Sequence, residues 1–134
     1  DGMSVQAGSI YVAPGGRHML AARVAGRVSI QLSDEPPENY CRPAVDPMLR
    51  SLANVYGAEL LAVILTGMGR DGADGCVVVA DRGGQFITQD EATSVVFGMP
   101  GAAFKTGRAL AQMSLDEIGA YLAEAMGRGV DLKR

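Results

Sequence analysis

A short, uninterrupted apolar run that leads directly into a glycine-rich loop constrains this chain more than any other feature. Residues 60–65 read Leu-Leu-Ala-Val-Ile-Leu, which is typical of a strand buried on both faces. Residues 66–72 (TGMGRDG) follow as a loop, residues 73–82 predict a short helix, and residues 85–89 predict a second strand. Because such a strand–helix–strand succession closes as a right-handed crossover, the segment predicts a βαβ unit with parallel strands. The expected class is α/β.

The flanking segments predict further elements. Residues 9–12 indicate a short strand, and alternating apolar residues predict a β-hairpin near residues 20–32 with its turn at Ala25-Gly26. The next helix is expected to begin with Asp46 as its N-cap and Pro47 as its first residue.

A final helix is predicted near the C-terminal end. It runs from Leu115 to about Met126, and Ser114 and Glu117 have the spacing of a capping box at its start. Its apolar residues recur at the helical period, so one face of the helix is expected to pack against the rest of the domain.

Composition excludes several functional classes. The 134 residues suit a single domain, and 12 basic against 15 acidic side chains leave no broad basic face for nucleic acid. No apolar run approaches the ~20 residues of a membrane span, so no membrane insertion is expected. Cys41, Cys76 and the single histidine, His18, do not have the spacing of a zinc site. We expect both cysteines to be buried small hydrophobes of a cytoplasmic protein without metal or cofactor.

Three hypotheses fit the loop at residues 67–72. The glycines can simply allow a sharp turn, with Asp71 or Asp74 capping the following helix. The same residues satisfy Gly-x-Gly-x-x-Gly, and Asp90 follows 18 residues after Gly72, as in dinucleotide-binding units. In the third hypothesis, Asp71 is a catalytic carboxylate that orients a histidine supplied elsewhere. Spacing alone leaves all three open.

Four ordered segments resemble the chemotaxis protein-glutamate methylesterases, which are also protein-glutamine deamidases. The resemblance covers residues 1 to about 125. The matching segments are YVAPGGRHM at 11–19, RPAVD at 42–46, LTGMGRDGA at 65–73, and QDE at 89–91 followed by VVFGMPGAA at 95–103.

The resemblance implies a fold and an activity. The fold would be a three-layer, Rossmann-like parallel sheet belonging to a doubly wound methylesterase domain. The activity would be the hydrolysis of glutamate methyl esters, and the deamidation of glutamines, on methyl-accepting chemoreceptors. Family members use a Ser-His-Asp acyl mechanism without a cofactor, and a response-regulator domain controls them.

The same resemblance assigns roles to residues. Asp71 would be the acid of the triad, and the backbone N–H of Met68 would contribute to an oxyanion hole. The cleft wall would come from residues of the matching motifs, each of which also has a purely structural interpretation: His18, Arg42, Asp46, Gln89, Asp90 and Met99.

The departures from the family pattern matter as much as the matches. The Ser-Thr-Gly-Gly loop with the serine and the Gln-His-Met-Pro motif with the histidine are absent, and Ala44 replaces a usual serine. His18 matches the Ala-Pro-Gly…His motif instead of the triad base. Residues 1–134 are therefore expected to be the C-terminal portion of one catalytic domain, without its N-terminal part or the receiver domain.

Two consequences are expected of such a portion. It should be inactive alone, and an uncovered strand edge should make it self-associate. The alternative hypothesis is a non-catalytic receptor-binding or regulatory module of the same fold.

Overall fold

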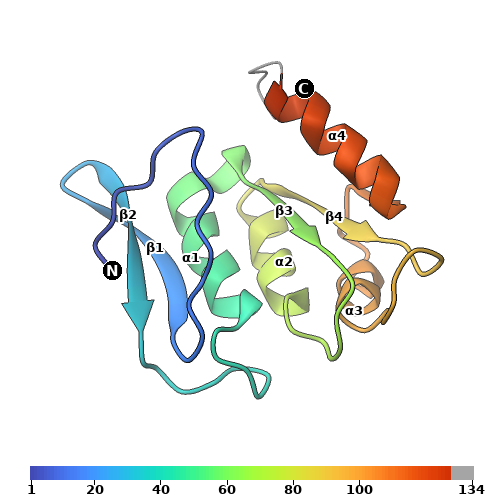
Figure 1. Ribbon diagram of the computed structural model, residues 1–134, viewed down its shortest axis with the longest axis horizontal. Helices are drawn as coiled ribbons and strands as arrows, with labels where there is room; N and C mark the ends of the chain where they lie inside the picture. Colours follow the sequence, from blue (N-terminus) through green and yellow to red (C-terminus); the bar gives the residue numbers. More distant parts are fainter. Residues whose placement is uncertain (128–134) are drawn as a thin grey trace.

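The computed structural model describes residues 1–127, which form two sheets and the helices packed against them (Figure 1). The elements follow in the order β1 (His18–Val24), β2 (Arg27–Ser33), α1 (Val45–Tyr56), the 3₁₀ helix η1 (Gly57–Glu59), β3 (Leu61–Ile64), α2 (Ala73–Asp81), β4 (Gln85–Gln89), α3 (Met99–Lys105), β5 (Ala111–Met113) and α4 (Leu115–Gly127).

The central sheet confirms the α/β class and the predicted βαβ unit. Its strand order is β3-β4-β5, and both pairs are parallel. Phe86 of β4 is fully buried and belongs to the core formed with residues of α1, α2 and α3. The next residue, Ile87, points to the opposite face, where α4 covers β4 and β5 (Figure 1). The sheet is thus the middle of three layers.

The predicted hairpin is confirmed and is slightly longer than expected. β1 pairs antiparallel with β2 from His18 opposite Ser33 to Val24 opposite Arg27. The turn residues Ala25 and Gly26 both have positive φ, at 52° and 79°, as a tight hairpin turn requires. α1 packs against both β1 and α2, so it joins the hairpin to the central sheet.

The predicted strand at residues 9–12 is wrong. These residues form no strand, and the side chains of Ile10 and Val12 are 92% and 84% exposed. The free edge of β2 is taken by earlier residues instead, because Gly2 N donates to Ile30 O at 2.7 Å and Val5 N to Val28 O at 2.8 Å. β-propensity without a free edge to pair with does not produce a strand.

Two further expectations need correction, and two elements were missed. Cys41 is exposed instead of buried, whereas Cys76 is buried, and burial raises the pKa of its thiol to about 12. Residues 60–65 are not buried on both faces: Ala62 and Ile64 are buried, but Leu65 is 44% exposed, because β3 is the edge strand of the described sheet. Neither α3 nor β5 was predicted from the sequence.

The start of α1 also differs from the prediction. The N-cap is Ala44, in an extended conformation, and Asp46 is the second helical residue and is buried. The Ser114–Glu117 capping box of α4 is confirmed, since Glu117 N donates to Ser114 Oγ and Ser114 N to Glu117 Oε1. None of the helices in residues 1–127 has the length and apolarity that a membrane crossing requires.

Candidate active site at the carboxyl ends of β3 and β4

The glycine loop that follows β3 is fixed against the segment that precedes α3. Gly67 N donates to Val96 O at 3.1 Å, and Met99 N donates to Gly67 O at 2.8 Å. A side chain at Gly98 would place its Cβ 2.8 Å from Gly67 O, so this close crossing of two backbones requires glycine. The two loops therefore form one rigid unit at the end of the sheet where catalytic groups gather in α/β folds.

Asp71 lies at the end of this loop, buried, with its carboxylate held by three donors. Oδ1 accepts from Asp46 N at 3.0 Å and from Asn39 Nδ2 at 3.0 Å. Oδ2 accepts from Val45 N at 2.6 Å. Asp71 thus caps α1, the neighbouring helix, and not α2, which follows it in the sequence. A carboxylate at a helix N-terminus is stabilised in its charged form by the free N–H groups.

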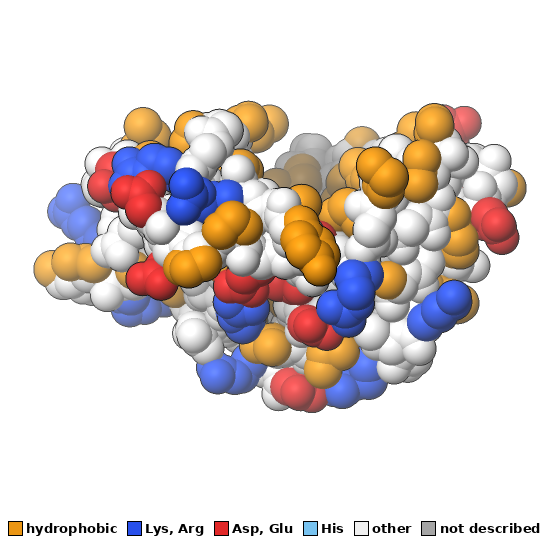
Figure 2. Space-filling view, turned by 90° about the horizontal axis from the view of Figure 1, so that it is seen from below, with side chains coloured by type: hydrophobic (Ala, Val, Ile, Leu, Met, Phe, Trp, Pro, Cys, Tyr) orange, Lys and Arg blue, Asp and Glu red, His pale blue; other side chains and the backbone are white. Residues whose placement is uncertain are grey.

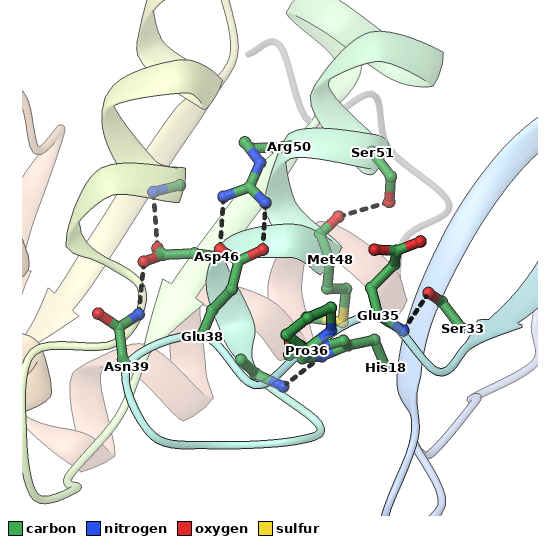
Figure 3. Close-up of polar contacts among 12 residues, drawn as sticks. His18, Ser33, Glu35, Pro36, Glu38, Asn39, Asp46, Met48, Arg50 and Ser51 are labelled. Atoms are coloured by element: carbon green, nitrogen blue, oxygen red, sulfur yellow. Dashed lines mark hydrogen bonds and ion pairs between the residues drawn. The ribbon is translucent and has the colours of Figure 1, made fainter.

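Asp46, at the start of α1, in turn caps α2. Its Oδ1 accepts from Gly72 N at 3.0 Å and from Gly75 N at 2.7 Å, at the start of α2. Its Oδ2 accepts from Asn39 Nδ2 at 2.8 Å, and Figure 3 shows Asp46 between Asn39 and that helix. We call Asn39, Asp46 and Asp71 the carboxylate junction. It cross-links the N-termini of α1 and α2.

The junction argues against the dinucleotide hypothesis. In such sites, the N–H groups at the start of the helix bind a pyrophosphate. Here Gly72 N and Gly75 N already donate to Asp46, and two buried carboxylates lie beside them. Asp74, the other residue expected as a cap, instead pairs with Arg70 at 3.1 Å on the surface, and this guanidinium lowers the pKa of the Asp74 carboxyl.

The backbone N–H of Met68 is free to meet a ligand. Among residues 1–127 it has no hydrogen-bond partner, and the Met68 side chain is 84% exposed. Gly69, the next residue, has a φ of 89°. An unpaired N–H on a rigid loop beside Asp71 is suited to binding an oxyanion.

Gln89 and Asp90 organise the loops instead of facing open space. Gln89 is buried, and its Oε1 accepts from Thr66 N at 2.7 Å while its Nε2 donates to Thr93 O at 2.9 Å. Asp90 Oδ1 accepts from the N–H and the hydroxyl of Thr93. Met99 is half-buried, and its Sδ would lie 2.6 Å from a Cβ at Gly67.

Within residues 1–127, neither His18 nor Arg42 forms a hydrogen bond with Asp71. His18 is 1% exposed; its Nδ1 accepts from Ala44 N at 3.2 Å, so Nε2 carries the proton and donates to Pro36 O at 3.0 Å (Figure 3). Both ring nitrogens are therefore used in holding the loop before α1. Arg42 is exposed and donates to the carbonyls of Asp34 and Glu35.

Sequence reasoning missed Asn39 and the ion pair beside it. Arg50 of α1 forms two hydrogen bonds with Glu38, at 2.9 and 2.6 Å, which lower the pKa of the Glu38 carboxyl and raise that of Arg50 (Figure 3). An asparagine in a polar loop indicates a turn, but nothing local indicates two carboxylates as its partners. On the face in Figure 2, acidic and basic side chains are interspersed among hydrophobic ones.

An apolar groove runs along the free edge of β3. Its volume is about 410 Å³. We call it the β3 groove; it is lined by β3 and its flanking residues 60–66, by Val45, Met48, Leu49 and Leu52 of α1, and by Met99.

Comparison with known proteins places this geometry in a family. The family model described as CheB methylesterase matches residues 1–122. A protein-glutamate methylesterase/protein-glutamine glutaminase of Azospirillum brasilense is 51% identical over 96% of this chain and 33% of its own length. One from Caulobacter vibrioides is 52% identical over 92% of this chain and 36% of its own length. The chain spans about a third of the length of these curated relatives.

The fold has a solved counterpart. The crystal structure of the Thermotoga maritima CheB methylesterase catalytic domain superimposes with a TM-score of 0.89 at 40% identity, covering 92% of this chain and 66% of that one. Sequence and structure therefore agree on the same assignment. The chain belongs to the CheB methylesterase family.

Proposed function

We propose that this chain is the C-terminal portion of a protein-glutamate methylesterase catalytic domain, and that the complete enzyme acts in the cytoplasm on methyl-accepting chemoreceptors. It would hydrolyse glutamate methyl esters and deamidate glutamines. The names of the relatives support this activity. The observation that carries it is the carboxylate of Asp71, which is buried and held rigidly after a strand end, with one acceptor position on Oδ2 that no described residue uses.

Asp71 would act on a histidine. A carboxylate offers about four acceptor positions, and the described residues use two on Oδ1 and one on Oδ2. The open position on Oδ2 would accept the Nδ1–H of the histidine, fix its tautomer and stabilise the imidazolium.

The remaining steps follow the chemistry of acyl transfer. The histidine takes the proton of a serine hydroxyl as the serine oxygen attacks the ester carbonyl. The Met68 N–H stabilises the resulting oxyanion. Collapse expels methanol, which receives the proton from the histidine, or ammonia when the substrate is a glutamine. Water, activated by the same histidine, then releases the glutamate and restores the serine.

The serine and the histidine would come from residues outside this chain. His18 is not suited to the role, because both its ring nitrogens are bound to backbone groups in a buried position. Among the other cleft candidates, Met99 borders the β3 groove, whereas Arg42, Asp46 and Gln89 would act indirectly by holding the loops in place.

The test is methanol release from methylated receptor. It compares the 134-residue chain, an upstream-extended protein, and that extended protein carrying Asp71→Asn. We expect activity only in the extended wild type, and a loss on the order of 10³- to 10⁴-fold in Asp71→Asn. Asp74→Asn is the matched control, because Asp74 lies three residues away and, within residues 1–127, its carboxylate hydrogen-bonds only to Arg70 at the surface.

The alternatives give different outcomes. Activity in the short chain alone would contradict the proposed origin of the serine and histidine. If the extended protein folds and binds receptor but releases no methanol, the non-catalytic receptor-binding module replaces the enzyme. If Asp74→Asn loses as much activity as Asp71→Asn, the effect belongs to the loop and not to the triad.

The β3 groove supports a proposal about partners. The outer edge of β3 has no strand paired to it within residues 1–127, and the groove beside it is apolar. The chain covers 66% of the matching solved domain and 33% of the length of a curated relative, so both contain residues beyond the matched region. We therefore propose that further residues of the same domain cover this groove, that a response-regulator domain belongs to the full protein, and that the isolated chain self-associates through β3.

A further inference from the structure

Asn39 lies on a tight turn that is anchored to α1. Glu38 and Cys41 exchange two backbone hydrogen bonds of 3.0 and 2.9 Å, and the two residues between them, Asn39 and Tyr40, both have positive φ. Asparagine tolerates this left-handed conformation better than most residues. The bidentate pair between Glu38 and Arg50 fixes the turn to the helix (Figure 3). The turn and this ion pair together determine the position of Asn39.

The amide of Asn39 joins two carboxylates that would otherwise repel each other. Its Nδ2 donates to Asp46 Oδ2 at 2.8 Å and to Asp71 Oδ1 at 3.0 Å, which uses both of its hydrogens. Within residues 1–127, no lysine or arginine forms an ion pair with either carboxylate. Besides Asn39, the donors to Asp46 and Asp71 are backbone N–H groups at the starts of α1 and α2.

This arrangement determines which oxygen of Asp71 remains available. The donor from Asn39 completes Oδ1, which already accepts from Asp46 N. Oδ2, with the single donor Val45 N, is left as the oxygen that can take a further N–H. Without the amide, both oxygens would have an open position, and only the N–H groups of Val45 and Asp46 would hold the orientation of the carboxylate about its Cβ–Cγ bond.

We propose that Asn39 is a positioning residue for the methylesterase reaction, which fixes the rotation of the Asp71 carboxylate so that Oδ2 faces the catalytic histidine. The inference rests on the proposed role of Asp71. It predicts that Asn39 acts on the rate of the chemical step through Asp71 and not on substrate binding.

The experiment is a double-mutant cycle in the full-length enzyme, with methanol release from methylated receptor as the readout. Asn39→Asp keeps the size and the backbone preference but replaces the donor with an acceptor. We expect kcat to fall by about 10- to 100-fold with KM unchanged within a factor of three. In the Asp71→Asn background, the same substitution should cost less than threefold.

Two additional variants separate positioning from folding. Asn39→Gly accepts the positive φ and removes only the amide, so it should reproduce the loss of kcat even if Asn39→Asp is poorly folded. Tyr40→Asn is the matched control, because Tyr40 is in the same turn with positive φ and its side chain is fully exposed. We expect Tyr40→Asn to keep kcat within a factor of two.

Each outcome decides between the hypotheses. If Asp71→Asn lowers kcat by orders of magnitude but Asn39→Gly does not lower it, the proposed function stands and the positioning role is overturned. If Asp71→Asn itself leaves kcat unchanged, the triad assignment fails first. If Asn39→Gly raises KM in place of lowering kcat, or lowers kcat equally in the Asp71→Asn background, Asn39 acts elsewhere than through Asp71.

Discussion

The carboxylate junction and the β3 groove are neighbouring parts of the same domain. They differ in how far this chain alone provides the partners of their side chains. In the junction, every carboxylate oxygen accepts at least one hydrogen bond from this chain, and the donors come from two helices and a loop. In the groove, apolar side chains and a strand edge face outwards. Burying a polar group without a hydrogen-bond partner is costly, whereas an apolar surface can stay exposed until another molecule or segment covers it. The junction is therefore a property of this chain, whereas the groove is a proposed interface.

The largest expected change in stability comes from a substitution that disrupts the junction. Asp46→Ala leaves Gly72 N and Gly75 N without an acceptor and Asn39 with only one of its two carboxylates. We expect the free energy of unfolding to fall by about 3 kcal/mol in urea denaturation, because buried donors lose charged acceptors. The control Asp74→Ala removes an exposed carboxylate and should stay within about 0.5 kcal/mol. Equal losses in the two variants would contradict the importance of the junction.

A smaller effect is expected where the two helices of the junction cross. A Cβ at Gly75 would lie 2.9 Å from Leu49 Cβ and 3.1 Å from Asp46 Oδ1. Gly75→Ala should therefore lower the free energy of unfolding by about 2 kcal/mol through overpacking. Gly119→Ala in α4 has open space around it and should be neutral or stabilise by up to about 1 kcal/mol. Thermal denaturation of the pair measures the contrast; a neutral Gly75→Ala would mean that the crossing is looser than described.

The groove should respond in the opposite way, with a small change in stability and a clear change in association. Val63 is half-buried on the edge strand and lines the groove. Val63→Lys should lower the free energy of unfolding by less than about 1 kcal/mol but weaken self-association of the 134-residue chain at least tenfold. Gln31→Lys adds the same charge at an exposed position of β2 and should leave association unchanged. Sedimentation velocity over a concentration series distinguishes them; a wild-type chain that stays monomeric contradicts the proposal.

The smallest effect tests the ion pair beside the junction. Arg50 lowers the pKa of Glu38 below its ordinary value of 4.5, so the pair stabilises the fold above that pH, and the contribution is lost as pH falls through the lowered pKa. The side chains are 36% and 43% exposed, so screening keeps the contribution to about 0.5 kcal/mol. Glu38→Gln should thus be less stable than wild type at pH 7, and this difference should be smaller at pH 3. Urea titrations at both pH values check this. A stability difference between wild type and Glu38→Gln that grows at low pH would contradict the stabilising role of the ion pair.

Local patterns in the sequence predicted the elements whose causes are themselves local. The apolar run at 60–65 and the residues after it predicted the βαβ unit, Ala25-Gly26 predicted the hairpin turn, and Ser114 with Glu117 predicted the cap of α4. Each depends on residues a few positions apart, so the sequence contains the whole cause.

The errors arose where the partner is distant in the sequence. Residues 9–12 have the composition of a strand, but residues 2–5 occupy the edge of β2. Asp46 has the residue type of an N-cap, but its carboxylate accepts hydrogen bonds from the N–H groups of Gly72 and Gly75, which lie 26 and 29 residues later in the sequence. No local rule identifies such pairs, because they depend on which helices pack side by side.

The sequence by itself determined the α/β class and the place of the glycine loop, since backbone preferences and spacing suffice for these. The choice of Asp71 within that loop came from the resemblance to a family. Only the tertiary structure decided what Asp71 contacts, that His18 is buried and fully bonded, and that Asn39 joins the two carboxylates. A buried polar group takes the partners that packing brings within about 3 Å, and packing is a property of the whole fold.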